Sequence, residues 1–157
     1  MTPSFYSPSH RSAASASLCR KIRGNTMRKW SILAALGGFF AVLAGALATH
    51  GLKDSVPAYE LGIFEMAAQY QMYHALALFA VAWVASQHAL DPRVKIFAEL
   101  AGWAFLVGTI LFSGSLYYMG MTQSRALVML TPLGGSAFLI GWAALLAAAW
   151  NLKREKA

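Results

Sequence analysis

The stretch WSILAALGGFFAVLAGALAT, residues 30–49, carries no charged side chain. About 20 apolar residues in a helix cross the roughly 30 Å of hydrocarbon in a bilayer. Three more apolar segments reach a similar length, at residues 67–86, 97–120 and 126–150. Because backbone N–H and C=O groups in hydrocarbon must be bonded within their own segment, each run is predicted to be an α-helix. The sequence therefore predicts an all-α integral membrane protein, a four-helix transmembrane bundle.

The composition supports the same class of protein. The chain has 157 residues, of which 58% are hydrophobic and 12% charged, about half the charged fraction of an ordinary soluble domain. Its net charge of +7 comes from short basic flanks between apolar runs and not from a surface where cations alternate with aromatics, so nucleic acid is not an expected partner. Cys19 is the only cysteine, which excludes an intrachain disulfide. The expected partners are the lipid bilayer and either a second copy or another membrane protein.

The distribution of lysine and arginine predicts the orientation. With the N-terminus inside, eleven of the 13 basic residues lie on the inner side, and only Lys53 and Arg125 lie outside. Without residues 1–26 the difference is still seven against two. The positive-inside rule therefore places both termini in the cytoplasm. The expected location is a bacterial inner (plasma) membrane, and the alternative is the mitochondrial inner membrane with both termini in the matrix.

Residues 1–26 differ from the transmembrane domain predicted for residues 27–157. They are rich in serine, contain four basic residues and have no acidic residue. Three interpretations stay open: a disordered basic extension, a true translation start at Met27, or an organelle transit peptide. The first apolar segment also has an alternative, a signal peptide cleaved after Ala46-Leu47-Ala48. Its apolar run is longer than the usual 7–15 residues of a signal peptide, and cleavage would leave three helices in the same orientation.

Polar residues gather at one level of this predicted bundle, the outer half. In the second segment, Glu65, Gln69 and Tyr73 fall within about 80° of one another on a helical projection. Tyr70 and His74 fall on another face, and polar groups exposed to lipid would cost several kcal/mol. We therefore expect protein or water around this part of the helix. The candidate residues of this outer-half polar cluster are His50, Glu65, Gln69, Tyr70, Gln71, His74, Ser113, Ser115, Tyr117 and Thr131.

Three interpretations of the cluster compete. In the first, its side chains join the helices by hydrogen bonds that contribute about 0.6–2 kcal/mol each. In the second, the protein is a small transporter or channel in which Glu65 and His74 titrate or contact a solute. A third, haem ligation by His50 and His74, rests on two isolated histidines only. No nucleophile or metal-ligand motif is present, so neither a catalytic activity nor a cofactor or metal is predicted.

Small residues spaced four apart predict close packing between helices. One ridge contains Gly37, Ala41, Gly45 and Thr49, and a second contains Ala137, Gly141 and Ala144. Small side chains let helix backbones approach each other in lipid, where no hydrophobic driving force acts between helices. In the third segment Thr109, Ser113 and Tyr117 have the same spacing, and we expect them to hydrogen-bond to the second helix.

Four motifs, THGLK, FEMAAQYQMYHALAL, LFSGSLYYMGMT and TPLGGSAFLIGWAAL, occur in this order between about residues 36 and 150. With them the chain resembles the YgdD-like family of small bacterial inner-membrane proteins, which has relatives in mitochondria-bearing organisms. The resemblance implies a four-helix inner-membrane protein of uncharacterised function and supplies no catalytic role. Members typically have GAHAL where this chain has Thr49-His50-Gly51-Leu52, so His50 matches while its neighbours differ. The motif positions are Glu65, Tyr70, Gln71, His74, Ser113, Gly114, Ser115, Leu116, Tyr117, Pro132, Gly134 and Gly135.

Overall fold

The computed structural model describes residues 9–87 and 91–152, and within these ranges the chain is helical apart from short turns. This confirms the predicted all-α class. Two of the helices are continued without a break by neighbouring helical segments. The elements in chain order are α1 (Ser9–Leu47), the π-helical η1 (Ala48–Leu52), α2 (Ala58–Gln87), α3 (Pro92–Gly108), the π-helical η2 (Thr109–Ser113), α4 (Gly114–Thr122) and α5 (Leu130–Trp150).

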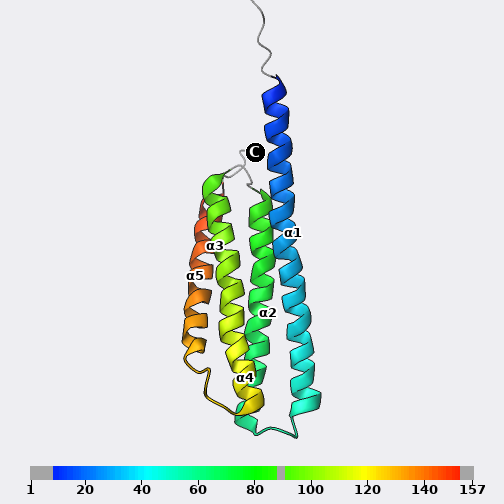
Figure 1. Ribbon diagram of the computed structural model, residues 1–157, viewed down its shortest axis with the longest axis vertical. Coiled ribbons are helices and arrows are strands. Elements are labelled where there is room, and N and C mark those ends of the chain that lie inside the picture. Colours follow the sequence, from blue (N-terminus) through cyan, green and yellow to red (C-terminus); the bar gives the residue numbers. More distant parts are fainter. Residues whose placement is uncertain (1–8, 88–90, 153–157) are drawn as a thin grey trace, which may run out of the picture.

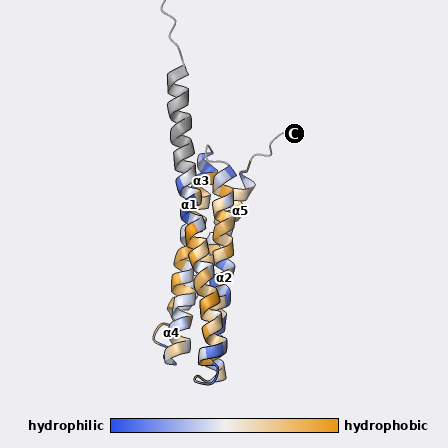
Figure 2. Ribbon diagram, turned by 90° about the vertical axis from the view of Figure 1, so that its right-hand side faces the viewer, coloured by the Kyte–Doolittle hydropathy of each residue, from blue (hydrophilic) through white to orange (hydrophobic). Residues whose placement is uncertain are grey.

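Within the described residues, three helical segments are long and apolar enough to cross a membrane, namely Gly24–Leu52, Pro92–Thr122 and Leu130–Trp150. They correspond to the first, third and fourth predicted spans. Helix α2 has 30 residues, but it includes the polar run from Gln69 to His74 and is not among the three. Figure 2 shows apolar residues along the middle of the helices and hydrophilic residues towards the ends of the bundle.

The helices lie side by side in the order α1, α2, α3 and α5, with α4 extending α3 towards the α1–α2 turn (Figure 1). Helix α1 packs mainly against α2, and α5 packs mainly against α3 and η2. Helix α2 contacts α1 on one side and α3, η2 and α4 on the other. The two halves of the bundle therefore meet along α2.

Helix α1 begins at Ser9, so the disordered extension predicted for residues 1–26 is helical from Ser9 onward. This part of α1 contains alanine, leucine, arginine and lysine, which favour helix. It also continues a long helix, so the cost of starting a new helix does not arise. Residues 1–8 lie outside the described residues, and a start at Met27 stays a prediction.

Glycines and phenylalanines alternate across the contact between α5 and the α3–η2 segment. A Cβ atom at Gly108 would overlap the Phe138 ring, and one at Gly141 would overlap the Phe105 ring. Near the start of α5, a Cβ at Gly134 would overlap the backbone of Phe112. Each large ring thus occupies the space that a glycine on the facing helix leaves open, and the backbones of α5 and η2 touch at Gly134.

The predicted small-residue ridge of α1 is correct at Gly37 and Ala41 and wrong at its C-terminal end. A Cβ at Gly45 would meet no atom within 4 Å, and Thr49 is exposed. A repeat of four residues advances by about 40° per step on a helix of 3.6 residues per turn, so a longer ridge rotates away from α2. The face that contacts α2 is formed by residues spaced three, four and seven apart, namely Ala34, Gly37, Ala41 and Ala48.

Candidate functional site

Gln71 joins three helices through its side-chain amide. Its Nε2 donates a hydrogen bond to the Gly37 carbonyl oxygen of α1 at 2.9 Å. Its Oε1 accepts a hydrogen bond from the Tyr117 hydroxyl of α4 at 3.0 Å. The side chain is buried, and the two bonds hold it between α1 and α4.

His74 is held by fixed partners at both ring nitrogens. Its Nδ1 lies 2.7 Å from the Tyr70 carbonyl oxygen, and the Trp142 indole N–H donates to its Nε2 at 3.3 Å. Because a carbonyl only accepts and an indole N–H only donates, these partners assign the neutral tautomer with the proton on Nδ1. The ring also stacks on Phe138 with centroids 3.4 Å apart. His74 therefore connects α2 to α5.

Ser115 and Thr131 connect α4 to α5. Their hydroxyl oxygens are 2.7 Å apart, and Ser115 also donates to the Phe112 carbonyl oxygen at 2.9 Å. Since Ser115 has one proton and uses it on that carbonyl, Thr131 is the donor between the two hydroxyls. This pair lies where α5 begins, one turn before the close contact at Gly134.

The predicted row of Thr109, Ser113 and Tyr117 is only partly correct. Tyr117 reaches α2, but Thr109 donates to the Phe105 carbonyl of its own helix. The Ser113 hydroxyl is buried without a hydrogen-bond partner among the described residues. Thr109–Ser113 is the π-helical segment η2, whose wider turn changes which residues share a face and so defeats an i, i+4 prediction.

Four of the predicted site residues are not enclosed by the bundle. His50, Glu65 and Gln69 are exposed, and Tyr70 is 38% exposed with its ring against Phe112, the ring centroids 4.7 Å apart. Protein of the same chain therefore encloses Gln71 and His74, and the face of α2 that carries Glu65 and Gln69 is left uncovered by the described residues.

The distance between His50 and His74 excludes haem ligation by this pair within one chain. A Cβ at Gly37 would lie 3.2 Å from the Ala75 Cβ, so Gly37 marks the level of His74 on α1. His50 follows Gly37 by 13 residues, or about 20 Å along the helix axis. Two axial ligands must bind one iron from opposite sides. No group of three His, Cys, Asp or Glu side chains that could hold a metal ion occurs in the described part of the chain.

Aromatic and charged partners that the sequence analysis missed complete the bundle. The Trp142 indole could have been identified, since an indole N–H in the middle of an apolar span needs an acceptor. At the other end of α1, Lys29 Nζ lies 2.7 Å from Glu99 Oε2 and 4.3 Å from the Trp30 ring centroid. Near the α1–α2 turn, Arg125 Nη2 lies 4.0 Å from Glu60 Oε1. These two ion pairs lie at opposite ends of the bundle.

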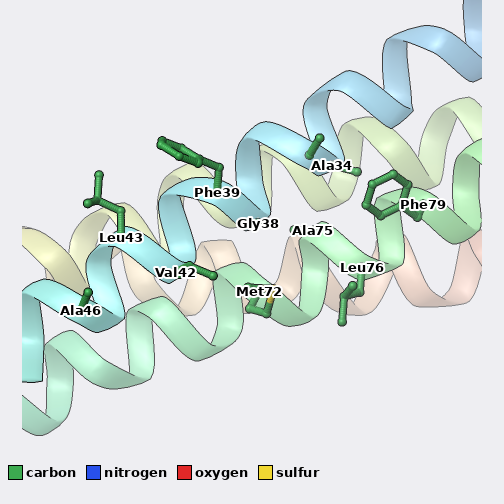
Figure 3. Close-up of a pocket in the computed structure, with 11 residues that line it drawn as sticks. Ala34, Gly38, Phe39, Val42, Leu43, Ala46, Met72, Ala75, Leu76 and Phe79 are labelled. Carbon is green, nitrogen blue, oxygen red and sulfur yellow. The ribbon is translucent and has the colours of Figure 1, made fainter.

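A groove of about 490 Å³ runs between α1 and α2 on the outer surface of the bundle (Figure 3). Its lining consists of aliphatic and aromatic side chains, one methionine and one glycine. No polar side chain lines this groove, so it offers no hydrogen bond to a polar solute. The residues at its edge on α2 include Met72, Leu76 and Phe79.

Residues 44–135 match the family described as "Protein of unknown function (DUF423)". The membrane protein YwdK of Bacillus subtilis is 42% identical over 123 residues, which cover 78% of this chain and 97% of the relative. A membrane protein of Haemophilus influenzae is 43% identical over 117 residues, covering 74% and 90%. The inner membrane protein YgdD of Escherichia coli K12 is 38% identical over 130 residues, covering 83% and 95%.

No solved structure matches the chain. All three relatives are named UPF0382 membrane proteins, which confirms both the predicted class of protein and the resemblance to the YgdD-like family. The names carry no activity, and the family description states none. The agreement extends over nearly the whole length of each relative. The chain belongs to the DUF423 family of membrane proteins.

Proposed function

We propose that this protein is a non-catalytic four-span bundle of the bacterial inner membrane, with both termini in the cytoplasm, whose polar cluster holds the helices together. The observation that supports this role is the use made of the buried polar side chains. Each of three buried side chains forms a hydrogen bond with a helix other than its own, Gln71 with α1 and both His74 and Ser115 with α5. Polar groups used in this way stabilise the bundle and are not available to a substrate.

The proposal includes α2 as the fourth span. Helix α2 has 30 residues, about 45 Å at 1.5 Å per residue, and it runs along α1. Its mean hydropathy is lowered by Gln69, Gln71 and His74, and the side chains of Gln71 and His74 are buried and bonded to other helices. A polar residue whose hydrogen bonds are satisfied inside the protein does not meet the lipid, so the part of this lowering that comes from Gln71 and His74 does not oppose insertion.

The topology can be tested with single cysteines in a Cys19→Ser background. We expect Ser55→Cys in the α1–α2 turn and Ala126→Cys before α5 to react with a membrane-impermeant maleimide added to the periplasmic side. Lys95→Cys, at the opposite end of the bundle, is expected to react only after the membrane is opened. Labelling of Ser55→Cys and Lys95→Cys from the same side would contradict the four-span topology.

A transporter or channel makes a different prediction. In liposomes that contain a pH-sensitive dye, we expect no proton flux from the wild type above that of protein-free liposomes. His74→Phe should behave in the same way, because both nitrogens of His74 are bonded within the bundle. It should, however, lower the unfolding temperature in detergent, while His50→Ala, at an exposed position, should not. A flux that His74→Phe abolishes and His50→Ala preserves would establish transport.

A further inference from the structure

The outward face of α2 carries polar side chains that no part of the described structure covers. Glu65 and Gln69 are exposed, and Tyr73 is 55% exposed. The Gln69 side chain has no hydrogen-bond partner among the described residues. An amide exposed to hydrocarbon without a partner costs several kcal/mol. This face of α2 therefore requires a partner that supplies hydrogen bonds.

The depth of Gln69 follows from the contact between α1 and α2. The Gln71 amide bonds to the Gly37 carbonyl oxygen, and Gly37 lies 13 residues from one end and 15 from the other end of the span Gly24–Leu52. Gln69 is two residues from Gln71, about 3 Å along the helix axis. It therefore lies close to the middle of the membrane, out of reach of bulk water.

The exposed residues of α2 form a seam with the spacing of a coiled coil. Positions 66, 69, 73, 76, 80 and 83 alternate steps of three and four residues. Met66, Tyr73, Leu76 and Trp83 are 45–59% exposed, and Ala80 is half-buried. Such a repeat keeps one face of a helix against a parallel partner helix, and a single polar residue within it fixes the register. Gln69 is the amide in this apolar and aromatic seam.

We propose that two copies of this protein form a parallel homodimer through the outward faces of their α2 helices, with Gln69 hydrogen-bonded to Gln69 of the partner subunit. The inference rests on the proposed function in one respect, the spanning of the membrane by α2. Copies inserted in the same direction are related by a two-fold axis along the membrane normal, so each residue near the axis meets its own equivalent at equal depth. An amide both donates and accepts and is therefore complementary to itself.

The groove between α1 and α2 adjoins this seam, because Leu76 belongs to both (Figure 3). A second α2 helix would therefore contact an apolar surface that extends from the seam into the groove, towards α1. A lipid chain in the groove would contact its apolar lining but would leave the Gln69 amide without a partner. A second copy satisfies both the amide and the apolar seam.

Disulfide crosslinking tests the dimer in membranes that contain the full chain with Cys19→Ser. With copper phenanthroline as oxidant, Leu76→Cys is expected to form a covalent dimer. The matched control is Leu139→Cys on α5, which is 73% exposed and lies away from the seam. Crosslinking of both variants to the same extent, or of neither, would overturn the proposal.

Energy transfer between labelled copies in diluted liposomes tests the role of Gln69. Loss of one interhelical hydrogen bond is expected to lower the association constant about 3- to 30-fold in Gln69→Leu, and Gln69→Asn should retain most of the association. An unchanged association constant in Gln69→Leu would refute the contact. If the maleimide labelling shows four spans and no dimer forms, this inference alone fails. If the labelling instead contradicts the four-span topology, both proposals fail.

Discussion

Gly134→Ala is expected to lower the free energy of unfolding by about 1–3 kcal/mol, the usual cost of overpacking a close contact. A methyl group at this position would overlap the backbone nitrogen and Cα of Phe112. A backbone cannot change rotamer as a side chain can, so α5 has to move away from η2. The measurement is the thermal unfolding of the purified protein in mild detergent, followed by circular dichroism.

The neighbouring glycine provides the control for this substitution. A Cβ at Gly135 would have Phe112 Cδ2 as its nearest neighbour at 3.9 Å, an ordinary van der Waals distance. Alanine is preferred to glycine inside a helix by up to about 1 kcal/mol, so Gly135→Ala should leave the stability unchanged or raise it. Equal losses in both variants would mean that the α5–η2 contact is looser than described.

Gln71→Leu is expected to lower the free energy of unfolding by about 1–4 kcal/mol, because it removes two interhelical hydrogen bonds worth about 0.6–2 kcal/mol each. The change leaves the Tyr117 hydroxyl without its acceptor and removes the second hydrogen bond to the Gly37 carbonyl oxygen, which keeps its bond within α1. Since Gly37 is on α1 and Tyr117 on α4, the loss should loosen the attachment of α1 to the rest of the bundle. Reversible unfolding in mixed detergent micelles measures it.

Two further variants check this assignment. Tyr117→Phe removes one of the two hydrogen bonds, so its effect should be smaller, and adding it to Gln71→Leu should cost little more. Gln69→Leu changes the same residue type two positions away on the exposed face and should leave the stability of the monomer unchanged. A loss in Gln69→Leu as large as in Gln71→Leu would refute the distinct roles of the two glutamines.

Much of the architecture follows from the sequence because hydropathy and segment length obey simple physical limits. The helical segments, the close approach at Gly37 and Ala41, and the gathering of polar side chains on α2 are all visible in the residues. Helical projection also separated Glu65 and Gln69 from His74. It could not show which face the other helices cover, because that depends on how α2 packs between α1 and α4.

The site itself was less accessible to sequence reasoning. The predicted contacts of Thr109 and Ser113 with α2 were wrong because η2 changes the helical period. No residue type in this segment indicates a π-helical turn. Trp142 was overlooked because it stands within an apolar run. The contact of Gly134 with the Phe112 backbone depends on the separation of two helices, which no local pattern contains.

The link between His74 and Trp142 has a consequence for biogenesis. Helix α5 leaves the ribosome after α1 and α2, so the first hairpin can satisfy Gln71 with Gly37 while the His74 imidazole still lacks its indole donor. That bond can form only after residue 142 has been synthesised and α5 has packed against α2. A product truncated before Trp142 would leave His74 Nε2 without its donor, while Nδ1 keeps the carbonyl oxygen of Tyr70 in its own helix.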